Sequence, residues 1–124
     1  MFSMNRNSMT TKSAKAKGRR LQNRLVGDLR KTFPDYPPEN FRPALMGEKG
    51  ADIKYSSGMH LKVPFAFEVK NCEQLNIWKA LDQAINHTSV FTPHPAVVFS
   101  RNKMESYVAI PLDIFLRMVK EWTK

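Results

Sequence analysis

The stretch Phe65–Lys70 reads FAFEVK, and its alternation of apolar and charged side chains decides the fold. Successive side chains of a β-strand point to opposite faces, so the apolar residues at the odd positions form one face. Glu68 and Lys70 project side by side from the other. Burying that face costs several kcal/mol of folding free energy for each charge, unless the charge is paired, metal-bound or at an open edge. The pattern predicts a strand that carries a site; the plainer alternative is a Glu/Lys pair on a solvated face.

The chain before this strand predicts a helix and then an extended connection. Leucine or phenylalanine recurs every four positions from Leu21 to Phe33, which is the stripe of an amphipathic helix over about residues 13–33. Four prolines between residues 34 and 43 exclude a helix there, because proline removes a backbone donor and clashes with the preceding turn.

The remaining segments predict two more helices and four more strands. Apolar residues at spacing four from Ile77 to Ile85 predict a helix over 75–88. Pro111 suits the first turn of a third helix, whose apolar positions run from Leu112 to Trp122. The other expected strands are 42–46, 52–56, 96–100 and 107–110. The predicted order is helix, three strands, helix, two strands, helix, which is an α/β fold.

Positive charge is concentrated at the start of the chain. The chain has 124 residues, enough for one domain, and a net charge of +9. Residues 1–31 hold nine basic side chains and one acid, so nearly all the excess lies there. Such a surface favours nucleic acid as the partner, and a solvated basic tail is the alternative. We expect a flexible basic arm over 1–12 and a single domain over 13–124. The candidate DNA-binding residues are Lys12, Lys15, Lys17, Arg19, Arg20 and Arg24.

Several classes of protein are excluded by composition. A single cysteine rules out an internal disulfide framework, and the three histidines lack paired zinc-ligand spacing. No run approaches ~18 apolar residues, and the start lacks the apolar segment of a secretory signal. We therefore expect a protein of the cytoplasm that does not contact membranes.

A second carboxylate strengthens the case for a site. Asp52 stands at the start of the preceding strand, after Gly50 and Ala51, so adjacent strands would bring it close to Glu68. Two carboxylates form an oxygen-rich site suited to Mg²⁺ or Mn²⁺. A metal there stabilises charge on a phosphate, and Lys70 is placed to orient or help deprotonate an attacking water. The predicted chemistry is phosphodiester hydrolysis.

These residues resemble the PD-(D/E)XK nuclease superfamily. Asp52 followed by Glu68-Val69-Lys70, between a basic helix and an apolar helix, stands where that superfamily has its motifs. Lys17-Gly18 and Gly47 add a similarity to archaeal-type Holliday junction resolvases and their small phage relatives. The resemblance implies a restriction-endonuclease-like core with a central, mixed, five-stranded sheet flanked by helices. It also implies an endonuclease that acts on branched DNA as a homodimer, encoded by a phage in a bacterial host.

The resemblance assigns roles to individual residues. Asp52 and Glu68 would hold Mg²⁺, which Mn²⁺ can replace, and Lys70 would be the catalytic lysine. Gln83 stands where some members place a glutamine near the site; its alternative is a solvent-facing helix residue. The departure is Gln22, where these resolvases carry a glutamate. A neutral amide ligates metal more weakly, so a DNA-binding module that has lost catalysis is the second hypothesis, and a basic adaptor protein the third.

Overall fold

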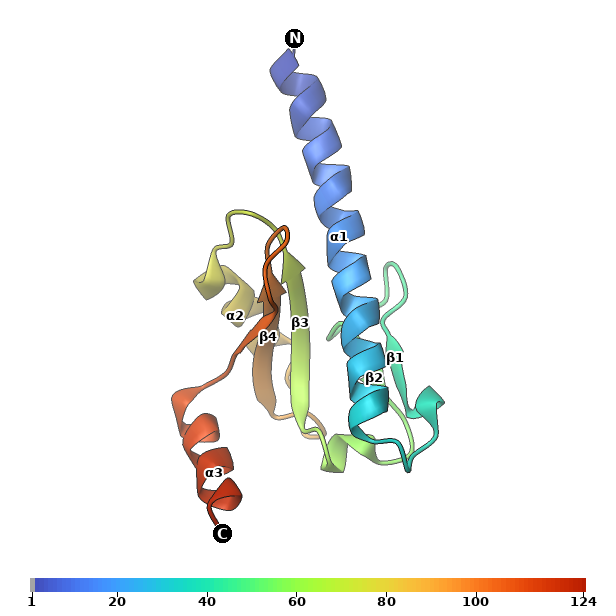
Figure 1. Cartoon of the computed structure of the whole chain (residues 1–124), viewed down its shortest axis with the longest axis vertical. Coiled ribbons are helices and arrows are strands. Elements are labelled where there is room, and N and C mark those ends of the chain that lie inside the picture. Colours follow the sequence, from blue (N-terminus) through green and yellow to red (C-terminus); the bar gives the residue numbers. More distant parts are fainter. Residues whose placement is uncertain (1) are drawn as a thin grey trace.

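The computed structural model describes the backbone of residues 2–124 and the side chains of residues 15–124. Over that range the chain forms three α-helices, two 3-10 helices and five strands (Figure 1). In chain order they are α1 (Phe2–Thr32), η1 (Pro38–Asn40), β1 (Phe41–Pro43), β2 (Ile53–Tyr55), η2 (Met59–Leu61), β3 (Phe65–Asn71), α2 (Ile77–Asn86), β4 (His94–Ser100), β5 (Tyr107–Ala109) and α3 (Leu112–Trp122). The order of helices and strands predicted from the sequence is confirmed.

Helix α1 packs through the predicted apolar stripe. Leu21 and Val26 are each 2 % exposed, and the later residues of the stripe pack against the same core. The end of the helix is tied to the chain that follows it. Arg30 donates from Nε to the Pro38 carbonyl and from Nη2 to the Phe41 carbonyl, each at 2.8 Å. These bonds hold α1 against β1.

The start of α1 falls in the segment 1–12, for which a flexible basic arm is expected. The backbone is helical from Phe2, and Met1 lies outside the described residues. No glycine or proline precedes Gly18, so the segment before it has no strong helix breaker. Whether the segment 2–12 moves in solution stays a prediction.

The strands form two sheets, so the expected five-stranded central sheet is wrong. β3 pairs with β4 in parallel and β4 pairs with β5 antiparallel, whereas β1 and β2 form a separate antiparallel pair. The backbone bond between the sheets runs from the Asp52 N–H to the Phe67 carbonyl, at 2.8 Å. Beyond it β2 diverges, because the Tyr55 side chain donates to the Phe65 carbonyl at 2.9 Å and the chain turns away at Gly58 in the left-handed region.

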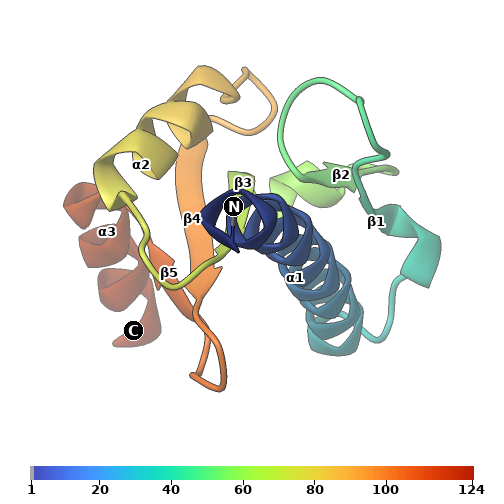
Figure 2. The same ribbon diagram turned by 90° about the horizontal axis from the view of Figure 1, so that it is seen from above.

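The two faces of β3 are covered by different helices. Phe67 and Val69 join the core that α1 forms with both sheets, whereas Val97 of β4 packs with Ala80 and Ala84 of α2. Seen from above, α1 lies between the β1–β2 pair and the three-stranded sheet (Figure 2). The predicted alternation of faces is therefore confirmed. Within the described residues, no helix has the length and apolar character needed to cross a bilayer.

Candidate active site

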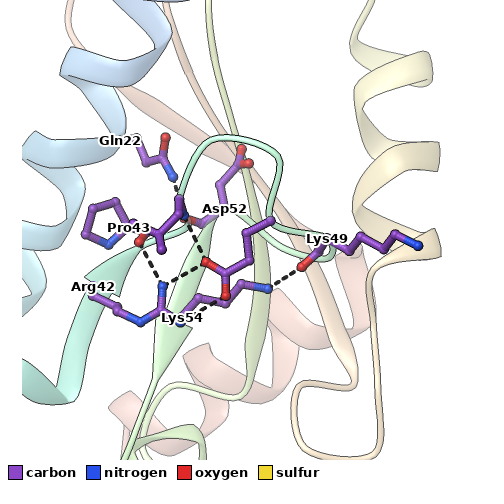
Figure 3. A network of polar contacts seen from close by, with 8 residues as sticks. Gln22, Arg42, Pro43, Lys49, Asp52 and Lys54 are labelled. Atoms are coloured by element: carbon purple, nitrogen blue, oxygen red, sulfur yellow. Dashed lines mark hydrogen bonds and ion pairs between the residues drawn. The ribbon is translucent and has the colours of Figure 1, made fainter.

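Asp52 sits at the joint between the two sheets. Besides its backbone bond to Phe67, its Oδ2 accepts the Val69 N–H at 2.7 Å, so backbone and side chain both hold it against β3. Its carbonyl accepts the Ala44 N–H at 2.7 Å and Nε2 of Gln22 at 2.5 Å. Figure 3 shows Gln22 reaching from α1 toward the Asp52 backbone. These contacts fix the position of the Asp52 carboxyl group beside the strand that carries Glu68.

Glu68 is a buried acid whose carboxyl group lies near that of Asp52. The residue is 5 % exposed, and its Oε1 is hydrogen-bonded to Nδ1 of His87 at the end of α2. Burial raises the pKa of Glu68, and the negative charge of Asp52 raises it further. Burial likewise raises the pKa of Asp52, against the hydrogen bond from Val69. The structure thus brings the two predicted carboxylates together.

Lys70 lies near both acids. It stands two residues after Glu68 on the same face of β3 and is half-buried. Its positive charge lowers the pKa of Asp52 and of Glu68, against the larger effect of burial. All three residues line one cleft of about 820 Å³. The grouping of Asp52, Glu68 and Lys70 expected from the sequence is therefore present in the structure, and their catalytic roles stay a prediction.

The walls of this cleft come from α1 and from the loop after β1. The helix contributes Lys15, Gly18, Arg19, Gln22 and Asn23, the loop contributes residues 43–48, and the floor is Asp52 with residues 68–72. Of the six basic residues predicted to bind DNA, Lys15 and Arg19 line the cleft. Lys17, Arg20 and Arg24 lie elsewhere on α1, and the side chain of Lys12 is outside the described residues.

Gln83 does not line the cleft. It lies on α2 one helical turn before His87, and its Oε1 is buried without a hydrogen-bond partner among the described residues. Asn71, at the end of β3, has an equally unpartnered Oδ1 and does line the cleft. Sequence reasoning missed Asn71, although it continues the strand one residue past Lys70.

His87 is the other residue that sequence reasoning missed. The spacing of the three histidines does not predict a zinc site, so it gives no reason to place His87 at a functional site. The signal that points to it is its place four residues after Gln83, which puts both on one face of α2. A histidine that holds a carboxylate belongs to a common arrangement around metal sites, where an outer hydrogen bond orients the ligand.

The donor set fits a divalent cation that prefers oxygen. Burial raises the pKa of both carboxyl groups and so disfavours their charged forms, although Lys70 and His87 act in the opposite direction; a divalent cation held by Asp52 and Glu68 would stabilise the ionised pair. Among the described side chains no group of three or more His, Cys, Asp or Glu gathers as a closed metal cage. Mg²⁺ is commonly bound by one or two carboxylates and keeps several waters, so two carboxylates suffice for it.

Comparison with protein-family models, with curated proteins and with solved structures finds no match to this chain. The class of protein therefore follows from fold and site alone. It is an α/β protein with a buried and a half-buried carboxylate and a lysine at the floor of a cleft, one wall of which is basic.

Proposed function

We propose that this protein is a metal-dependent endonuclease that hydrolyses phosphodiester bonds in DNA. The observation that carries the proposal is the convergence of Asp52, Glu68 and Lys70 in one cleft beside the basic residues of α1. Carboxylates alone would repel a phosphate backbone. A site that places them next to Lys15 and Arg19 instead suits a polyanion that is held by basic groups while a cation bridges it to the acids.

Each residue has a distinct part in this reaction. Asp52 and Glu68 would hold Mg²⁺, or Mn²⁺ in its place, and His87 keeps the Glu68 carboxyl group oriented. The bound cation supplies charge stabilisation to the phosphate. Lys70 orients the attacking water or helps to remove its proton, because it shares the cleft with both acids and its positive charge acts on each of them. The side chains of α1 position the DNA backbone.

The proposed substrate is branched DNA. Contacts from Lys15 and Arg19 reach phosphates, which position a nucleic acid without specifying its sequence. The protein would then recognise its DNA by the shape of the DNA and not by its base sequence. A four-way junction has a distinct shape and presents two strands to cut. Cutting both requires two sites, hence a symmetric homodimer. An enzyme of this kind works where the DNA is, in the cytoplasm of a bacterial host, and a phage gene is its proposed source.

One observation favours a second function, a DNA-binding module without catalysis. The amide of Gln22 is turned to the Asp52 carbonyl, so its nitrogen and not an oxygen faces that part of the backbone. A glutamate at this position would offer the cleft a third carboxylate. Without it the chain has two acids for metal, which weakens binding but leaves the basic wall intact.

Cleavage of labelled DNA separates these functions. The purified chain is incubated with four-way junction, flap, duplex and single-stranded DNA in Mg²⁺ and in Mn²⁺. The site variants are Asp52→Asn, which can still accept the Val69 N–H, and Glu68→Gln. The matched control is Asp82→Asn, because Asp82 is an exposed residue of α2. Paired symmetric cuts in the junction, lost in both site variants and kept in the control, are expected.

Other results have definite meanings. Metal-dependent cutting of another substrate supports the nuclease and rejects the junction preference. Tight, salt-sensitive binding with no cutting of any substrate in either metal would reject the nuclease in favour of the DNA-binding module. Cutting that survives both Asp52→Asn and Glu68→Gln would show that the activity does not come from this site.

A further inference from the structure

Helix α3 turns its apolar stripe toward solvent. Leu112, Phe115, Leu116 and Trp122 are 70, 50, 56 and 88 % exposed, although their spacing is that of a buried helix face. Ile114 is the buried residue of the helix and lies on the opposite side from Leu116. The helix is therefore anchored by Ile114 and the half-buried Val119, while most of its apolar stripe is uncovered. Helix α3 stands at the lower end of the molecule away from α1 (Figure 1).

The strand that leads into α3 is also uncovered. β5 is the edge of the order β3-β4-β5, and its residues Tyr107 and Val108 are each 54 % exposed. An edge strand presents backbone N–H and C=O groups that can pair with another strand. Ile110 and Pro111 alone separate β5 from α3. We call the exposed apolar side chains of α3, with the edge strand β5 beside them, the C-terminal apolar face: Leu112, Phe115, Leu116 and Trp122. Tyr107 and Val108 are neighbours on β5 and point to opposite sides of the sheet, so one of the two can join this face.

The charge of this face differs from that of the DNA-binding side. Helix α3 carries two acids and two bases, which are Asp113, Glu121, Arg117 and Lys120. The first 31 residues carry nine bases and one acid. The balanced helix offers no attraction to nucleic acid or to anionic lipid. A second copy of the same neutral face can approach it without the repulsion that two α1 surfaces would produce.

We propose that the C-terminal apolar face binds a second copy of this chain across a two-fold axis. At roughly 200 Å² for a large side chain, the four exposed residues of α3 and one of the two β5 residues offer on the order of 600 Å². A standard interface buries about 800 Å² per partner, so the face is close to the required size. A two-fold axis sets α3 against the partner's α3 and lines up the two β5 edges in the antiparallel direction. The cleft on the α1 side takes no part.

The first test is the mass of the full chain in solution without DNA or metal. Light scattering and sedimentation over a range of concentrations are expected to give twice the 14.3 kDa of the chain at micromolar concentration. Leu116→Glu places a charge in the face and is expected to weaken association at least about 30-fold, since a like charge meets its symmetric copy. Leu61→Glu is the matched control, because Leu61 is 78 % exposed on η2, outside the face.

Each outcome bears on the proposal. Because Leu116 is exposed, Leu116→Glu is expected to keep the circular dichroism and the melting temperature of a folded monomer. A wild-type chain that stays monomeric to about 100 μM, or a dimer that Leu116→Glu leaves intact, would overturn it. A Leu116-dependent association with anionic vesicles in place of dimerisation would overturn it in favour of a lipid surface. Slower hydrogen exchange at Tyr107–Ala109 in the dimer would support the pairing of β5 edges.

The proposal shares with the proposed function the expectation of a dimer, but its test does not use cleavage. A dimeric chain that cuts no DNA would support this interface and reject the nuclease. A monomer that cuts a flap would do the reverse. Asp52→Asn is expected to remain dimeric, which separates loss of the site from loss of the interface.

Discussion

Gln22 allows a sharp prediction because its structural and chemical roles point in different directions. Its Nε2 donates to the Asp52 carbonyl at 2.5 Å, and the Ala44 N–H donates to the same oxygen at 2.7 Å. Gln22→Met removes one of two donors and leaves the carbonyl satisfied. The expected loss of stability is therefore the net value of one hydrogen bond, about 1 kcal/mol, and not the larger cost of an orphaned acceptor.

Gln22→Glu has a larger expected effect of the same sign. An ionised glutamate sets an acceptor against the Asp52 carbonyl and adds a third negative charge beside the carboxyl groups of Asp52 and Glu68. We expect a loss of about 3 kcal/mol without metal. At about 4 °C per kcal/mol for a chain of this size, the melting temperature falls by about 4 °C for Gln22→Met and about 12 °C for Gln22→Glu.

Added metal is expected to reverse the order of the two variants. The new carboxylate of Gln22→Glu is an oxygen donor, so Mn²⁺ should raise its melting temperature more than that of the wild type, whereas Gln22→Met should respond like the wild type. The assay is thermal unfolding followed by circular dichroism in EDTA and in millimolar Mn²⁺. A Gln22→Glu variant as stable as wild type in EDTA would refute the expectation that a third carboxylate beside Asp52 and Glu68 destabilises the folded chain.

Three further predictions follow from other parts of the structure. Because burial raises the pKa of Asp52 and of Glu68, the folded chain binds their protons more tightly than the unfolded chain, so its free energy of unfolding in EDTA should fall as the pH rises above the ordinary carboxyl pKa of about 4; urea titrations at each pH check this, and Asp52→Asn should flatten the slope. Phe41→Ala should cost about 3–5 kcal/mol by urea unfolding, since Phe41 is 1 % exposed between Phe33 and Tyr55, whereas Phe91→Ala, 63 % exposed, should cost under about 1 kcal/mol. His87→Ala leaves the Glu68 carboxyl group without its partner and should weaken Mn²⁺ binding about 10-fold in calorimetric titration, with partial rescue by His87→Gln; unchanged affinity would show that Glu68 is held by the strand alone.

Local patterns predicted the elements of this fold well. The alternation over Phe65–Lys70 is a property of adjacent residues, so it identified both the strand and the two faces that α1 and α2 cover. The stripe from Leu21 to Phe33 likewise identified the packed part of α1. Each of these signals depends on spacing within one element, and spacing is what a sequence displays directly.

Such local patterns do not predict which strands pair with one another. The strand expected over 42–46 ends at Pro43, because Glu48 accepts the Leu45 N–H at 2.9 Å and binds Arg42 at 2.8 Å, which folds the segment into a loop. That loop joins β1 to β2, and the two sheets are separate because β2 diverges from β3 after Asp52. No periodicity of apolar residues in the sequence predicts a contact between a glutamate of a loop and an arginine of a strand.

The site was predicted in part for the same reason. Asp52 and Glu68 lie at neighbouring strands, and neighbouring strands are commonly paired, so their approach could be expected. The contact of His87 with Glu68 depends on how α2 packs on β3, which is a tertiary event. Gln22 was noticed as a departure from a resembling family, but its bond to the Asp52 backbone required the structure.

The attachment of the two sheets at Asp52 has a consequence for how the protein folds. The contacts that assemble the site join residues 17, 19 and 30 positions apart, from Asp52 to Val69, from Glu68 to His87 and from Gln22 to Asp52. Such contacts form after local helices and turns, because closing long loops costs chain entropy first. A nascent or partly folded chain therefore holds its two acids apart in water. If the proposed function holds, the ability to bind metal would appear only after these long-range contacts form, so an unfinished chain would not cut DNA.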